Sequence, residues 1–71
     1  MHRYLIIIES TATGFSAYSP DLPGCAAVGA SQPDAEHAMR EAIELHLQGL
    51  RDAGLSIPVG GTSAAFVEVA A

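Results

Sequence analysis

The 71-residue chain has few side chains capable of acid–base, metal or nucleophilic chemistry: three histidines, one cysteine and eight carboxylates. His46 lies within an apolar helical pattern without an identifiable base partner, so we interpret it as a partly buried packing residue rather than a catalytic one. His37, Glu41 and Glu44 share the polar face of the same pattern, which admits a weak metal site. A solvated face explains them better, because nothing shields or orients these side chains.

The remaining candidates also lack the partners that they would need. Cys25 has no neighbouring cation to lower its pKa, and we interpret it as a small apolar residue of a strand. Asp21 lies in a turn, where a carboxylate commonly accepts a hydrogen bond from a backbone N–H. Two-metal hydrolysis requires several clustered carboxylates, whereas Glu9 and Glu68 are the only acids in the strands predicted below. We therefore predict no catalytic, cofactor-binding or metal-binding residue, and a protein that is not an enzyme.

The composition indicates one acidic domain spanning residues 1–71. The formal net charge is −5, with three arginines and no lysine, so direct binding of DNA or RNA is not expected. An acidic surface suits a basic protein partner, although acidity alone also keeps proteins soluble. The longest apolar run, at residues 5–8, is too short to cross a membrane, and the sequence shows no signal peptide or disulfide framework. These features favour a cytoplasmic protein.

A rigid turn at residues 19–25 organises the predicted fold. Its motif consists of Pro20, Asp21, Leu22, Pro23 and Gly24. Pro20 ends the preceding strand because it has no N–H for a ladder, while Pro23 and Gly24 fit the central positions of a type II turn. Strands are predicted around this turn at residues 2–9, 14–18 and 25–30, with a polar turn at residues 10–14.

A long amphipathic helix is predicted after the third strand. Ser31 matches an N-cap, followed by Pro33 and Asp34 in the first turn, and Gly54 matches a left-handed stop after Ala53. Between the two caps, Ser31 and Gly54, apolar and polar residues separate onto two faces. The predicted apolar face comprises Ala35, Ala38, Met39, Ala42, Ile43, Leu45, His46, Leu50 and Ala53. A loop rich in proline and glycine and a fourth strand at residues 64–70 complete the prediction.

The order β-β-β-α-β predicts an α+β domain in which one long helix covers one face of a small sheet. The first strand is apolar on both sides, so Leu5 and Ile7 would need cover from outside the chain. The helix, at about 33 Å, would also overhang strands of about 20 Å. We therefore predict a homo-oligomer, either a dimer or a tetramer. Its predicted interface comprises Leu5, Ile7, His46, Leu47 and Leu50.

Four motifs together resemble the HicB family of antitoxins, over about residues 4–58. They are the turn at residues 18–25, the following Gly29, the helix start at residues 34–36 and the helix exit at residues 54–58. The resemblance implies a partial RNase H-like fold with four mostly antiparallel strands in the order 3-2-1-4. It also implies a function in a type II toxin–antitoxin system, in which HicB neutralises HicA, a small basic toxin that degrades messenger RNA.

The sequence departs from the family at its end. Many HicB antitoxins continue into a DNA-binding domain, whereas this sequence stops at Ala71, so no DNA binding is expected. An alternative hypothesis is a stand-alone homo-oligomeric interaction module, or a module for a small ligand, without a toxin partner. A neighbouring gene for a short basic protein would favour the antitoxin over this alternative.

Overall fold

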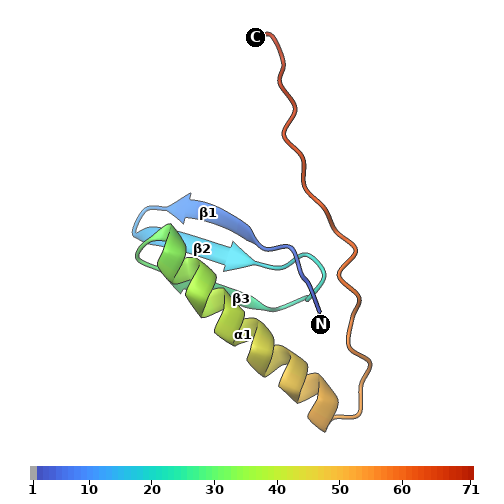
Figure 1. The fold of residues 1–71 in the computed structure, drawn as a ribbon. Coiled ribbons are helices and arrows are strands. Elements are labelled where there is room, and N and C mark those ends of the chain that lie inside the picture. Colours follow the sequence, from blue (N-terminus) through green and yellow to red (C-terminus); the bar gives the residue numbers. More distant parts are fainter. Residues whose placement is uncertain (1) are drawn as a thin grey trace.

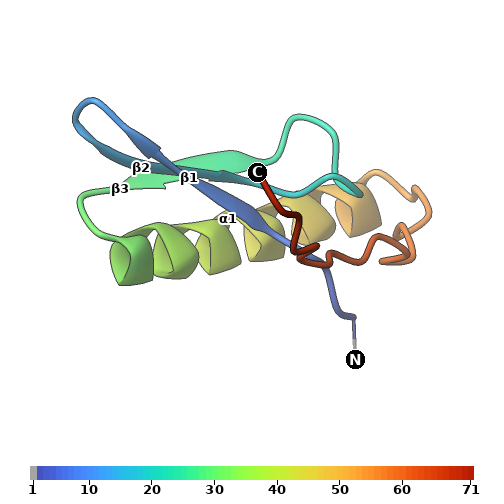
Figure 2. The same cartoon turned by 90° about the horizontal axis from the view of Figure 1, so that it is seen from above.

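The computed structural model describes residues 2–71 and shows a small sheet with one long helix across one face (Figures 1 and 2). The strands are β1 (Ile7–Thr11), β2 (Gly14–Tyr18) and β3 (Ala26–Gly29), and the helix is α1 (Gln32–Asp52). Both pairs of neighbouring strands are antiparallel, in the order β1-β2-β3. The α+β class is confirmed.

β1 begins and ends later than the predicted strand at residues 2–9. β2 ends at Tyr18, so Ile7, which lies opposite Tyr18, is the first residue of β1 with a ladder partner. At the other end Thr11 pairs with Gly14, which shortens the predicted turn to a two-residue hairpin loop. The position of the proline turn after β2 therefore sets where β1 can start.

The turn after β2 has the predicted conformation. The Leu22 N–H donates to the Ser19 carbonyl at 3.2 Å, and the Cys25 N–H donates to the Leu22 carbonyl at 3.1 Å. Gly24 has a φ of 80°, which is the value required at the third position of a type II turn. Between these two turns the Leu22 side chain is fully buried, so it anchors the whole loop in the core.

Both predicted caps of α1 are confirmed. The Ser31 side chain accepts a hydrogen bond from the Asp34 N–H at 3.2 Å, as an N-cap does. At the other end Gly54 has a φ of 71° and donates its N–H to the Arg51 carbonyl, while the Leu55 N–H donates to the Leu50 carbonyl. This pair of bonds is a Schellman motif, so Gly54 ends the helix by a left-handed conformation that a side chain would disfavour.

α1 packs against the sheet through a core of six buried apolar residues. Leu45 was predicted to lie on the packed face but is 75% exposed, because it lies about 120° around the helix from Met39. Ala53 is likewise exposed. Leu47 is only 7% exposed and occupies the core instead. The core consists of Ala17, Leu22, Cys25, Ala35, Met39 and Leu47.

The predicted fourth strand is wrong. Residues 64–70 form no strand and are exposed, so the sheet has three strands rather than four in the order 3-2-1-4. β1 consequently lies at an edge of the sheet, and nothing within residues 2–71 pairs with its outer side. We refer to residues 55–63 as the arm and to residues 64–71 as the tail.

The tail extends away from the sheet and helix (Figure 1). The Cα radius of gyration is 13.9 Å, compared with about 11 Å for a compact domain of this length. α1 also extends beyond the sheet towards its C-terminal end (Figure 1). Among residues 2–71, no helix has the length and apolar character needed to cross a membrane.

Candidate functional site

The arm is anchored to the sheet by contacts that lie far apart in sequence. Ile57 packs against the core, and the Tyr4 hydroxyl donates to the Pro58 carbonyl at 2.6 Å. Further along, Thr62 donates twice to the Asp21 carboxylate, from its N–H at 3.2 Å and from its hydroxyl at 2.7 Å. Asp21 therefore accepts a backbone N–H, as expected for a turn carboxylate, and fixes the arm just before the tail begins.

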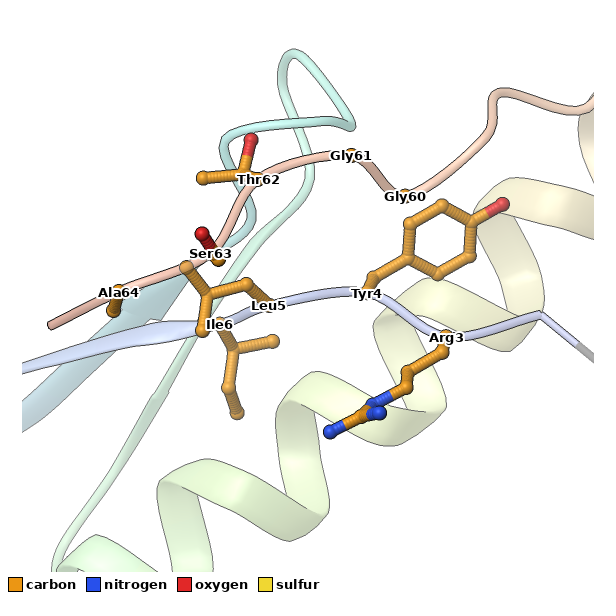
Figure 3. Close-up of a pocket in the computed structure, with 9 residues that line it drawn as sticks. All are labelled: Arg3, Tyr4, Leu5, Ile6, Gly60, Gly61, Thr62, Ser63 and Ala64. Atoms are coloured by element: carbon orange, nitrogen blue, oxygen red, sulfur yellow. The ribbon is translucent and has the colours of Figure 1, made fainter.

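The N-terminal segment preceding β1 lies beside the arm (Figure 3). A side chain at Gly60 would collide with the Arg3 carbonyl, so the two backbones approach closely there. Figure 3 shows Leu5 pointing towards Ser63 and Ile6 pointing towards the helix. The buried Ser19 hydroxyl also donates to the Leu5 carbonyl at 3.0 Å, which ties this segment to the proline turn.

A cavity of about 670 Å³ lies between the N-terminal segment and the arm (Figure 3). Its lining contains no His, Cys, Asp or Glu, so it offers neither a nucleophile paired with a base nor a set of metal ligands. The cavity therefore has the character of a packing gap rather than a reaction site. It is lined by Arg3, Tyr4, Leu5, Ile6, Gly60, Gly61, Thr62, Ser63 and Ala64.

A shallow groove of about 930 Å³ runs between residues 2–6 and α1. Its lining includes the apolar side chains of Ile6 and Ile43, while Arg40 and Glu44 supply charge of both signs. Apolar surface bordered by mixed charges is typical of a protein contact, and the groove shows no arrangement of groups that points to a particular small ligand.

The exposed side of α1 is acidic. The helix contains five of the eight carboxylates of the chain but only two arginines, and all seven of these side chains are exposed. On this surface, the one contact among the described residues between a carboxylate and a side chain that can carry positive charge joins His37 Nε2 to Glu41 Oε1 at 2.9 Å. A surface of this charge attracts basic partners through long-range electrostatic steering. The carboxylates are those of Asp34, Glu36, Glu41, Glu44 and Asp52.

The outer face of the sheet, opposite α1, is partly apolar. Ile7, Tyr18 and Ala26 lie side by side on this face through the strand register, and Val28 lies two residues further along β3. Tyr18 and Val28 are exposed, and Ile7 is half-buried. No helix covers this face in the part of the chain that the structure describes (Figure 2).

The residues predicted to form an oligomer interface do not lie on one surface. Leu5 and Ile7 are half-buried on the outer side of the sheet, whereas His46 and Leu50 are half-buried on α1. Leu47 lies within the core of its own chain, so it is not available to a partner. The structure therefore removes Leu47 from the predicted interface, and a contact through Leu5, Ile7, His46 or Leu50 stays a prediction.

The titratable side chains do not assemble into a reaction centre. Cys25 is buried, and removal from water raises the pKa of its thiol, which makes the thiol less reactive. Within residues 2–71, no group of three or more His, Cys, Asp or Glu side chains is placed to hold a metal ion.

Sequence reasoning missed the residues that anchor the arm. Asp21 was expected to accept a backbone N–H, but the sequence did not indicate that the donor would be Thr62, 41 residues away. The contact between Tyr4 and Pro58 spans 54 residues. No local pattern signals such pairs, because both depend on where the arm crosses the sheet.

A model of a protein family described as "HicB_like antitoxin of bacterial toxin-antitoxin system" matches residues 4–69. The match includes the sheet, α1, the arm and most of the tail. A search of curated proteins gave no match.

The fold is also similar to a solved chain in a structure described as "HicA3 and HicB3 toxin-antitoxin complex". The two sequences are 32% identical, and the match covers 84% of this chain and 70% of that chain, with a TM-score of 0.72.

Proposed function

The chain belongs to the HicB-like antitoxin family, because the family model matches residues 4–69, and we propose that it inhibits a small toxin of the HicA kind. The observation that carries this proposal is the 32% identity to a chain from a toxin–antitoxin complex, over 84% of the present chain. The partner would be a basic ribonuclease that degrades messenger RNA, and the antitoxin would act by covering its catalytic surface in the cytoplasm.

Charge supports this choice of partner. The net charge is −5, and the exposed side of α1 contains five carboxylates that face solvent. A ribonuclease that holds an RNA backbone needs a cationic surface, and a complementary acidic surface would both attract that surface and compete with RNA for it. The same acidity is the reason that we assign the chain no direct binding of DNA or RNA.

We assign the chain no catalytic role. Glu9 lies on the exposed part of β1 and Glu68 lies on the exposed tail, so these two carboxylates share no enclosed site in which metal ions could be held. Inhibition by occupancy requires only a stable complex, so it needs no catalytic group.

We also propose that the chain associates with itself. The support is the partly apolar outer face of the sheet, where Tyr18 and Val28 are exposed and Ile7 is half-buried. A chain of 71 residues has little core of its own and gains stability by burying such a face.

Growth rescue tests the antitoxin proposal. A toxin of the HicA kind is induced in a host cell, with or without co-expression of the full chain. We expect the toxin alone to stop growth, co-expression to restore growth, and the two proteins to purify together. An unrelated acidic protein of similar size is the control and is expected to restore nothing. Growth arrest that persists while the full chain accumulates in soluble form would contradict the proposal.

A further inference from the structure

The tail has the composition of a strand but no partner within its own chain. Phe66 is fully exposed, Val67 is 81% exposed and Val69 is 80% exposed. Val67 and Val69 project to one side of an extended chain, and Phe66 projects to the other, so both sides of the tail carry large apolar groups. Leaving three such side chains in water is unfavourable, which indicates that the tail is buried in the functional assembly.

The outer edge of β1 is unpaired, and the tail is long enough to cover it. Its inner edge pairs with β2 through Ile7–Thr11, and no segment of residues 2–71 pairs with its outer edge. Five residues of β1 span about 17 Å, and the seven residues 64–70 span about 23 Å when extended. An open edge of this kind accepts a further strand through backbone hydrogen bonds.

The arm holds the tail away from the β1 edge of its own chain. Thr62 is fixed by two hydrogen bonds to Asp21, only two residues before the tail begins. The arm runs beside the N-terminal segment in the same direction (Figure 3), but beyond it the tail diverges from β1 (Figure 1). The anchored arm therefore presents the tail to a neighbour while its own β1 edge remains open.

We propose that residues 64–70 of one copy form a fourth strand on the outer edge of β1 in a second copy, and that the second copy returns the same contact. Each chain supplies one tail and one β1 edge. Two copies related by a two-fold axis therefore pair both tails and both edges, and the dimer is closed. The proposal rests on the self-association proposed above, and it is independent of toxin binding.

Isotope-filtered NMR on the wild-type chain tests the proposal directly. A sample that mixes labelled and unlabelled chains selects nuclear Overhauser effects that connect different copies. We expect effects between the Phe66 ring and the side chains of Ile7 or Ile8 in this intermolecular spectrum. The same effects found only within one copy would overturn the proposal, because the tail would then pair with its own β1. Phe66 contacts that arise only after toxin is added would also overturn it.

Two substitutions in the full chain supply a matched pair. Val67→Asp places a carboxylate where the exchanged strand is buried, and we expect it to weaken the dimer about 100-fold. Val59→Asp makes the same change at a residue of the arm that is 87% exposed, and we expect it to leave the dimer unchanged. Sedimentation measures both dissociation constants. Equal effects of the two substitutions would overturn the proposal.

The outcomes separate this inference from the proposals on which it builds. A wild-type dimer without contacts between Phe66 and β1 of the second copy would overturn strand exchange and leave self-association intact. A wild-type chain that sediments as a monomer would overturn both. Neither outcome bears on toxin neutralisation, which growth rescue measures separately.

Discussion

Gly29 is the residue at which β3 and α1 come closest together. A side chain at this position would collide with the backbone of Asp34 and Ala35, which cannot move without displacing the start of the helix. We expect Gly29→Ala to lower the free energy of unfolding by about 2 kcal/mol, as overpacking of a tight contact does. Urea denaturation at fixed protein concentration measures the change.

Gly49 provides the control for this substitution. It lies within α1, and a Cβ there would meet no atom within 4 Å. Gly49→Ala should therefore raise the free energy of unfolding by about 0.8 kcal/mol through helix propensity alone. If Gly29→Ala also raised the free energy of unfolding, the close contact between Gly29 and the start of α1 would be contradicted.

Because of Cys25, we expect the fold to lose stability at alkaline pH. Burial raises the pKa of this thiol, so in the folded chain it keeps its proton to a higher pH than in the unfolded chain. The contribution to stability is complete below the ordinary thiol pKa and is lost as the pH rises above it, because the unfolded chain then ionises first. We expect the free energy of unfolding of the wild type to fall more steeply between about pH 7 and about pH 10 than that of Cys25→Ala. Equal slopes for the two proteins would show that the thiol is not desolvated.

At the scale of the elements, α1 is both a packing element and an acidic surface. Glu41 and Glu44 are exposed on it, and Glu41 lies within 2.9 Å of the exposed His37. Replacing both glutamates by lysine should therefore preserve the fold, because exposed charge pairs contribute little to stability. It should weaken toxin binding about tenfold at low salt, and less at high salt.

Glu9→Lys is the control for the change on α1, and it makes half of that change in net charge. Glu9 is also exposed but lies on β1, away from the acidic helix. Calorimetric titration with the toxin at two salt concentrations measures all the affinities. A loss of binding free energy from Glu9→Lys half as large as that from the double substitution would show that net charge, rather than the helix surface, governs binding.

Some elements of this fold are determined by residues close together in the sequence, and others are not. The type II turn at Pro23 and Gly24, the N-cap at Ser31 and the stop at Gly54 follow from local conformational preferences, and the structure confirms all three. β2 likewise has the predicted bounds. Each depends on residues only a few positions apart, which is why sequence alone was sufficient.

Strand pairing was less predictable because it depends on partners far away in the chain or outside it. The tail has the alternating apolar residues of a strand, but this pattern does not specify an edge to pair with, and the tail forms no strand in the structure. The exchange of Leu45 for Leu47 in the core has a different cause. Leu45 lies about 120° around the helix from the buried Met39, whereas Leu47 lies about 80° from it, so Leu47 falls within the face that packs on the sheet.

At the scale of the whole molecule, three surfaces remain for partners. They are the acidic side of α1, the partly apolar outer face of the sheet, and the tail with the free edge of β1. The last two suit a second copy of the chain, and the first suits a cationic toxin. Because these surfaces lie on different elements, self-association and toxin binding can be tested by separate substitutions.

Titration of the toxin's ribonuclease activity measures whether this chain inhibits the toxin. The purified toxin is incubated with messenger RNA while the full chain is added in increasing amounts, and intact RNA is measured. We expect cleavage of the RNA to fall in proportion to the added chain and to stop once the toxin is saturated. Cleavage that continues unchanged in the presence of excess folded chain would contradict this expectation.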